Sequence, residues 1–272
     1  MAALVALAGC GGDAAEEGAD DGLPFSDPTE SEDVNAIWGE FACAERNRLA
    51  VEPEGGVDGG AFRRLTVIDG DDADGERCEL GRNDHTDGPT AVYRDGDRRT
   101  TTFAVRLPED FPLDTDRFQV VMQMKQTQPA ANGDGTPILS LEARDGRWIL
   151  FQSTSAGPSA DTRELWSAPA KTGVWTRFEM DGTYSADPEE GSIRIQADLD
   201  EDGELETDSG EIQGYTLKRE TEGGEEGDGI EPGEAIPSHL RLGLYHDPKV
   251  LCPPPEGCSV EIDDVEIAAQ GV

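Results

Sequence analysis

From residue 37 to the C-terminus, short apolar runs alternate with turns rich in Gly, Asp and Pro. Each run has the length of a strand, and several are rich in β-branched or aromatic residues, as is typical of β-structure. Asp145-Gly146 lies between two such runs and predicts a hairpin turn. No helix of ten or more residues is indicated, so we expect an all-β sandwich or jelly roll. The expected strands lie within residues 63–71, 100–108, 118–126, 138–152, 175–185, 192–200, 239–247 and 258–267.

The N-terminus indicates an export signal. Residues 2–9 form an apolar run that ends at Cys10, which is similar to a bacterial lipobox, where the cysteine after the cut carries lipid. The run is short and no basic residue precedes it, so an apolar start with a chance cysteine is the alternative. Residues 11–36 hold nine acidic residues and no Lys or Arg, which predicts a disordered tether. We therefore expect a signal and tether over residues 1–36 and one domain over residues 37–272. The protein would be lipid-anchored to the cell membrane or secreted.

The composition is strongly acidic. The chain has 22 basic and 59 acidic residues, a net charge of −37, and without residues 11–36 the net charge is still −28. A nucleic-acid binder needs a basic surface, so this class is excluded. A salt-adapted surface and a GC-rich genome explain the Arg-rich, acidic composition equally well. No apolar stretch is long enough for a membrane-spanning helix, so only a lipid anchor would attach the protein to a membrane.

The cysteines indicate an oxidising compartment. Without Cys10, four of the five cysteines remain, and an even number in an exported protein predicts disulfides. Cys252 and Cys258 flank a short Pro-Pro-Pro-Glu-Gly loop that a disulfide would close, which leaves Cys43 to pair with Cys78. A zinc site is the weaker alternative, because there is no Cys-x-x-Cys pair and the three histidines are scattered.

Three segments have one apolar and one polar face when they are placed on strands, because alternate side chains share a face. In residues 239–247, three leucines share one face, with polar side chains on the other. Residues 118–126 place two methionines opposite Gln and Lys, and residues 76–82 place Cys and Leu opposite Arg and Glu. Such faces are most often merely solvated, but the mixture of amide, cationic and phenolic groups favours a binding groove. The candidate residues are Arg77, Glu79, Gln123, Lys125, His239, Arg241 and Tyr245.

The same segments resemble a known family. RCEL at 77–80 resembles the R-[ST]-E-[LV] motif of jelly-roll polysaccharide lyases, and QMK at 123–125 lies where those enzymes have Gln-x-His. HLRLGLYHD at 239–247 resembles their Tyr-x-Lys-x-Gly-x-Tyr strand. The segments LPEDFP, QVVMQMKQ, LSLEARDGRW and GVWTRF are similar to the heparin lyase I-like group, so the likeness covers about residues 38–268. It implies a jelly roll with a concave groove and β-elimination of uronate-containing polysaccharides.

The resemblance implies roles for these residues. Gln123 and Arg77 would neutralise the uronate carboxylate, which makes the C5 proton acidic, and Tyr245 would act as the acid, with a second role as base left open. Glu79 would orient Arg77. Lys125 replaces the family histidine, and it is a base only if burial or a nearby cation lowers its pKa.

Arg241 and His239 would contact the substrate, although His239 replaces the family's first tyrosine. Gly243 would leave room for a sugar ring. His85 lies in a loop that can reach the groove rim, and His246 falls on the leucine face and is interpreted as structural.

The sequence is also compatible with other functions and ligands. A non-catalytic glycan-binding lipoprotein is the main alternative, because Lys125 replaces the histidine. Glu261, Asp263 and Glu266 match a glycosidase carboxylate motif, but they lie too near the C-terminus for its usual context. No cofactor is required, and we expect a monomer. The one possible metal is a structural calcium ion at Asp198, Asp200 and Asp202, followed by Gly203, Glu206 and Asp208, although Ser209 stands where a calcium loop has its last Glu.

Overall fold

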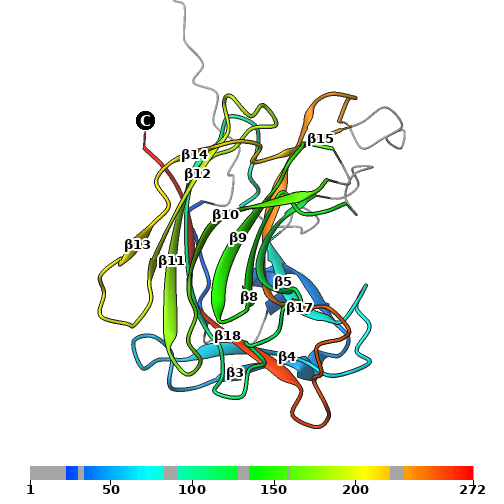
Figure 1. Cartoon of the computed structure of the whole chain (residues 1–272), viewed down its shortest axis with the longest axis vertical. Helices are drawn as coiled ribbons and strands as arrows, with labels where there is room; N and C mark the ends of the chain where they lie inside the picture. Colours follow the sequence, from blue (N-terminus) through cyan, green and yellow to red (C-terminus); the bar gives the residue numbers. More distant parts are fainter. Residues whose placement is uncertain are drawn as a thin grey trace, which may run out of the picture.

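Two antiparallel sheets pack face to face (Figure 1). The computed structural model describes residues 23–29, 34–82, 91–127, 135–157, 160–220 and 230–271. Cys10 and His85 therefore lie outside the described residues. Within these ranges, no helix is long and apolar enough to cross a membrane.

The first sheet has seven strands, and it carries the candidate residues. Its spatial order is β10 (Thr162–Pro169), β9 (Arg147–Ser153), β8 (Leu139–Arg144), β7 (Gln119–Gln126), β17 (Ser238–His246), β5 (Arg77–Arg82) and β2 (Gly39–Cys43).

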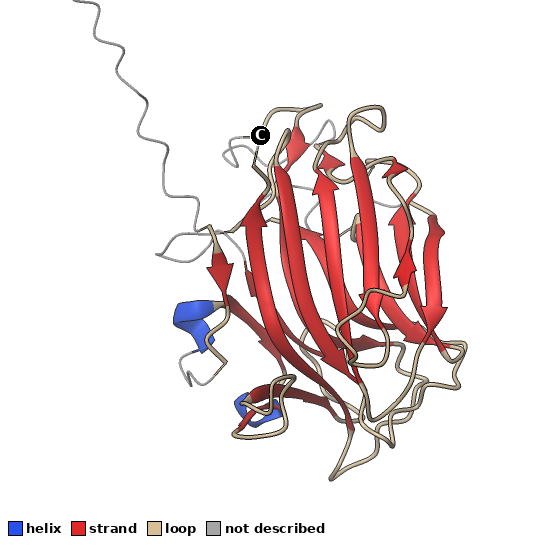
Figure 2. Ribbon diagram, turned by 90° about the vertical axis from the view of Figure 1, so that its left-hand side faces the viewer, coloured by secondary structure: helices blue, strands red, loops and turns tan. Residues whose placement is uncertain are grey.

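The second sheet has nine strands (Figure 2). Seven of them lie in the order β13 (Thr207–Asp208), β12 (Ser192–Asp198), β11 (Trp175–Thr183), β6 (Arg98–Arg106), β18 (Cys258–Ala269), β4 (Phe62–Val67) and β3 (Leu49–Glu52). In addition, β1 (Phe25–Ser26) pairs with β18, and β14 (Ile212–Gln213) pairs with β12.

The remaining elements of the described chain are small. Strands β15 (Lys218–Arg219) and β16 (Ala235–Ile236) form a separate two-stranded sheet. The helical elements are α1 (Val34–Ile37) and the 3-10 turn η1 (Arg46–Arg48). The prediction of an all-β jelly roll is confirmed.

The core fills the space between the two sheets. Phe103 and Phe178 stack with their ring centroids 5.2 Å apart, and Trp148 packs edge-on against Phe178 at 5.3 Å. Strand β17 contributes three leucines that are fully buried, Leu240, Leu242 and Leu244. Because alternate residues face opposite sides of a sheet, burying these leucines turns the polar side chains of β17 away from the core.

The predicted strands coincide with observed ones to within a few residues. Residues 138–152 form the hairpin β8–β9, and Asp145 and Gly146 have φ angles of 52° and 70°, as the predicted two-residue turn requires. Among the strands of four or more residues, the pattern missed β2, β3 and β10. Strands β2 and β3 are short, and β10 carries charged residues along its exposed edge.

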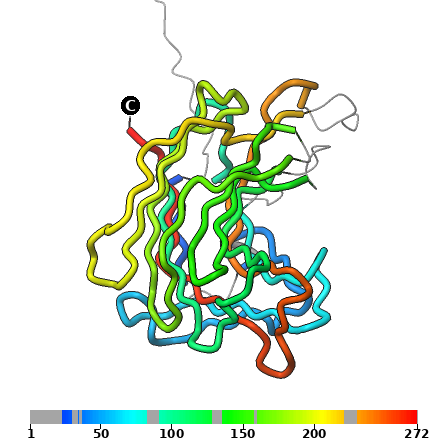
Figure 3. The backbone as a smooth tube through the Cα atoms, in the orientation of Figure 1, coloured from blue at the N-terminus to red at the C-terminus, as the bar shows by residue number. Residues whose placement is uncertain are grey.

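The tether predicted for residues 11–36 is wrong in its C-terminal part. Phe25 is buried in the core, and β1 pairs with β18 near the other end of the chain; the blue and red ends of the tube lie side by side in Figure 3. Asp27 accepts two hydrogen bonds from the guanidinium of Arg63, at 2.7 and 2.8 Å, and a third from Trp38 at 2.9 Å. The acidic run therefore also contains residues that are fixed to the folded domain, which the charge count alone does not reveal.

Both predicted disulfides are present. Cys43 and Cys78 face each other across β2 and β5 with their Cα atoms 4.0 Å apart, and Cys252 bonds to Cys258 with a Cα separation of 5.0 Å. The first disulfide fixes the edge strand β2 to the strand that carries Arg77 and Glu79.

We predict that Asp27→Ala destabilises the fold by about 3–5 kcal/mol, because it leaves the buried guanidinium of Arg63 without the carboxylate that compensates its charge. The two side chains are only 2% and 0% exposed. Chemical denaturation measures the free energy of unfolding. As a control, Glu164→Ala removes an exposed ion pair with Arg147 and should cost less than about 1 kcal/mol. Equal losses in the two variants would contradict the anchoring role of residues 23–29.

Candidate active site

A cavity of about 530 Å³ lies on the polar face of the seven-stranded sheet. Its lining includes all four residues predicted to be catalytic, which come from β5, β7 and β17. Gln123 and Tyr245 therefore lie on the same side of the molecule, as the matching alternation of the two strands predicted. The cavity extends across the strands toward β10, and it is lined by Asp74, Arg77, Phe118, Val120, Gln123, Lys125, Gly135, Thr136, Pro137, Ser140, Glu142, Thr162 and Tyr245.

Gly243 has a different role from the one expected. It has a φ of 152°, and a Cβ atom built on it would lie 2.1 Å from the carbonyl oxygen of Cys78. The missing side chain therefore lets the backbone of β5 approach and does not leave room for a sugar ring. Next to it, the pairing of β17 with β7 shifts register between Leu242 and Tyr245, as in a β-bulge.

Tyr245 is half-buried at one end of the cavity. The guanidinium of Arg77 lies 4.0 Å from the centroid of its ring, and Phe118 contacts the ring with centroids 5.2 Å apart. Within the described part of the chain, no hydrogen bond engages the tyrosine hydroxyl. The ring is thus held by a cation and an aromatic neighbour, while the hydroxyl is available to a ligand.

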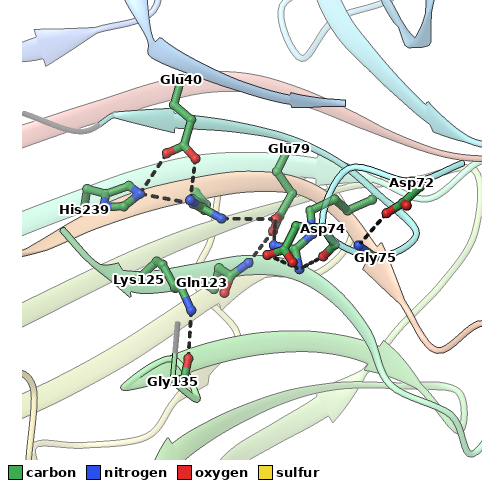
Figure 4. A network of polar contacts seen from close by, with 11 residues as sticks. Glu40, Asp72, Asp74, Gly75, Glu79, Gln123, Lys125, Gly135 and His239 are labelled. Carbon is green, nitrogen blue, oxygen red and sulfur yellow. Dashed lines mark hydrogen bonds and ion pairs between the residues drawn. The ribbon is translucent and has the colours of Figure 1, made fainter. Parts of the chain in front are cut away.

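Glu79 lies at the centre of a polar network beside the cavity (Figure 4). Its carboxylate is fully buried, accepts a hydrogen bond from Nε2 of Gln123 at 2.6 Å, and pairs with Nη1 of Arg77 at 3.4 Å. Nη1 of Arg241 lies 3.9 Å away. Burial raises the pKa of Glu79, while the charges of Arg241 and Arg77 oppose this shift. One buried anion therefore holds the two groups expected to bind the substrate carboxylate.

A second carboxylate extends this network. Glu40 on β2 pairs with Nη2 of Arg241 and lies 3.2 Å from Nε2 of His239. A Cβ atom on Gly81 would lie 2.6 Å from the Glu40 carboxylate, so a glycine is needed for this contact.

Arg241, His239 and Glu79 were expected to contact or orient the substrate, but they do not line the cavity. Their polar groups face one another and Glu40. The structure therefore places them as supports for the lining residues and not as direct contacts, because burying a charge requires partners within the protein.

Lys125 lines the cavity and donates a hydrogen bond from Nζ to the carbonyl oxygen of Gly135 at 2.8 Å. It lies directly across from His239 in the pairing of β7 with β17. The segment that begins at Gly135 also forms part of the cavity wall, so Lys125 fixes that wall as well as facing the ligand space.

Lys218, which the sequence pattern did not single out, supports the part of the cavity wall formed by Gly135, Thr136 and Pro137 through contacts outside the cavity. Its fully buried Nζ donates to the carbonyl oxygen of Gly157 at 2.8 Å and to Oγ of Ser153 at 3.0 Å. Ser153 in turn donates to the carbonyl oxygen of Pro137 in the cavity lining. Burial and the nearby charge of Lys125 lower the pKa of Lys218 to about 8.

Glu142 on β8 is a second residue that was not predicted. It lines the cavity although only 8% of its surface is exposed, and burial raises its pKa against the effect of Arg144. Its signal was present in the sequence, because Leu139, Leu141 and Ala143 alternate with Ser140 and Glu142 as the leucines of β17 alternate with its polar residues.

The acidic loop predicted to bind calcium lies beyond the end of β12, in the nine-stranded sheet. Carboxylate oxygens of Asp198, Asp200, Asp202 and Glu206 lie within 4.8 Å of one another. Asp208 instead pairs with Arg194 at 2.6 Å. The Asp198 carboxylate already accepts backbone N–H groups of the loop. The calcium site stays a prediction, and it would be structural because it lies in the other sheet.

The glycosidase-like carboxylates also belong to the other sheet. Glu261 pairs with Arg64 and Arg106, and Asp263 accepts the backbone N–H of Val57 at 2.9 Å. Both are buried on β18, outside the cavity of the seven-stranded sheet. His246 is buried on the leucine face, with Nδ1 near the carbonyl oxygen of Asp247, as the structural interpretation expected.

Comparison with known proteins decides the family. The model of the polysaccharide lyase family matches residues 32–259. The chain belongs to this family. No curated protein matches the sequence.

Solved structures of polysaccharide lyases share the fold. The endo-β-1,4-glucuronan lyase of the fungus Trichoderma reesei is similar with a TM-score of 0.57 and 16% identity, over 86% of this chain and 91% of that one. The alginate lyase A1-II′, of polysaccharide lyase family 7, is similar with a TM-score of 0.51 and 11% identity, over 84% and 86%.

We predict a pH-dependent contribution of Lys218 to stability. Its pKa is about 8 in the folded protein and 10.5 ordinarily, so between these values the unfolded chain binds more protons. The buried ammonium therefore lowers stability below pH 8, and this cost disappears as the pH rises toward 10.5. Over this range, the free energy of unfolding of the wild type should rise by at most about 3 kcal/mol relative to that of Lys218→Met.

Chemical denaturation of both proteins at pH 7.5 and pH 10, which together span most of the window from about 8 to 10.5, measures this difference. Lys171→Met, at an exposed position, is the matched control and should show no such gain. If the free energies of unfolding of the wild type and Lys218→Met change with pH in parallel, the lowered pKa of Lys218 is contradicted.

Proposed function

We propose that this protein cleaves uronate-containing polysaccharides of low sulfation by β-elimination. The main support is the cavity of this polysaccharide lyase family member, which brings together Arg77, Gln123, Lys125 and Tyr245. Two proteins of the same fold are named as glucuronan and alginate lyases, which supports a uronate substrate. A heparin-like, highly sulfated substrate is less well supported, because acidic residues pair with both arginines of the network and the chain carries a net charge of −37.

The proposed reaction begins with the uronate carboxylate. Arg77 and Gln123, both held by Glu79, bind it and stabilise the negative charge that develops when the C5 proton leaves. The electron pair of the C5–H bond then forms the C4=C5 double bond, and the bond from C4 to the glycosidic oxygen breaks. The leaving oxygen takes a proton, so the products are a saturated reducing end and an unsaturated uronate.

We assign both proton transfers to Tyr245. The Arg77 guanidinium above its ring stabilises the phenolate that takes the C5 proton, and the resulting phenol gives a proton to the leaving oxygen. Lys125, the other candidate base, donates to Gly135 as an ammonium group, so we assign it to binding of the substrate. Glu79, Arg241 and His239 position these groups.

We also propose an extracytoplasmic location with lipid attached at Cys10. Its support is the lipobox-like N-terminus together with two disulfides, which persist in oxidising compartments. A polymeric substrate that does not enter cells fits the same location.

Incubation with a panel of uronate polymers, followed by ultraviolet absorbance of the conjugated double bond, tests the proposed activity. Absorbance should rise with at least one unsulfated polymer. Retained binding to a polymer without any rise in absorbance would instead support the non-catalytic glycan-binding alternative, which the replacement of the family histidine by Lys125 favours.

We predict that Tyr245→Phe lowers the elimination rate by about 10²–10⁴, because it removes an acid–base group and keeps the ring between Arg77 and Phe118. Substrate affinity should change little. Tyr215→Phe, outside the cavity, is the matched control and should keep full activity. If Tyr245→Phe remains fully active while Lys125→Ala abolishes elimination, Lys125 is the residue that carries the chemistry.

A further inference from the structure

Glu142 lies in the same cross-strand row as Tyr245. Tyr245 on β17 faces Val120 on β7, and Val120 faces Glu142 on β8. Neighbouring strands are about 4.8 Å apart, so the backbones of Tyr245 and Glu142 are separated by roughly 10 Å. Because the cavity spans the strands from Arg77 to Thr162, a polysaccharide bound along it at Tyr245 would pass over Val120 and Glu142.

The Glu142 carboxylate is suited to a hydrogen-bond donor and not to another anion. The Glu142 side chain is 11% exposed, and no hydrogen bond from the described residues reaches its buried Oε2 atom. Arg144 lies 3.3 Å from Oε2, but its guanidinium stacks on Phe151 at 4.7 Å and does not line the cavity. A uronate placed here would bring a second carboxylate beside one that is largely buried, and like charges repel more strongly where solvent screens them less.

We propose that Glu142 forms a subsite for a neutral or N-acetylated sugar, which donates a hydroxyl or amide N–H to the carboxylate. Val120, an apolar neighbour in the same row, offers a surface for the face of the ring. This inference rests on the proposed function and specifies its substrate class. The substrate is a polysaccharide in which uncharged sugars interrupt the uronates, and a polymer made of uronate alone is a poor substrate.

Two polymers and one variant test this subsite. The polymers are glucuronan and an unsulfated glycan in which glucuronate alternates with N-acetylglucosamine. The wild type should cleave the alternating glycan with the higher kcat/KM. Glu142→Gln, which keeps the size of the side chain, should shift the ratio of the two kcat/KM values toward glucuronan by at least about tenfold. Glu179→Gln, on β11 of the other sheet, should leave the ratio unchanged.

An equal or higher kcat/KM of the wild type on glucuronan, or an unchanged ratio in a folded Glu142→Gln protein, would overturn the subsite. Thermal unfolding checks that the variant is folded. If no polymer is cleaved, the proposed activity fails, and the subsite is then judged by affinity alone. Calorimetry with oligosaccharides of the two polymers should show the same preference and the same shift in Glu142→Gln, and equal affinities would contradict it.

Discussion

The site depends on the burial of one carboxylate. Glu79 is removed from water among Gln123, Arg77 and Arg241, and the fold has to provide all three partners because an isolated buried charge is costly. Its partners come from three adjacent strands, β5, β7 and β17, so their registers must be correct at the same time. The bulge at Gly243 sets the register of β17 against β7, and the disulfide joins β5 to its other neighbour, β2, which carries Glu40. The same contacts that satisfy Glu79 aim Arg77 and Gln123 at the cavity.

The arrangement also reconciles a very acidic chain with the proposed anionic substrate. The two arginines of the network are held locally by Glu79 and Glu40, while most of the negative charge lies elsewhere on the molecule. Such a groove carries little excess positive charge. It therefore suits the proposed polymer of moderate charge density, and the proposed subsite at Glu142 would select an uncharged sugar at one point of the binding surface.

Alternation along single strands allowed much of the site to be predicted. The leucines of β17 and the methionines of β7 identified which side chains face away from the core, and the sequence motifs then placed Arg77, Gln123 and Tyr245 together. Glu142 followed the same rule on β8 but belonged to none of the motifs. Glu40 and Lys218 were beyond this reasoning, since their contacts depend on which strands and loops become neighbours. The ion pair that fixes Asp27 to the domain could not be predicted for the same reason, because its partner Arg63 is 36 residues away.

The most direct test of β-elimination is digestion of a cleaved polymer in heavy-oxygen water, with mass spectrometry of the products. Elimination forms no new bond to water, so the account predicts unsaturated fragments without heavy oxygen beyond that in an enzyme-free incubation of the same fragments. Saturated fragments that each carry one heavy oxygen would show hydrolysis and would contradict the account.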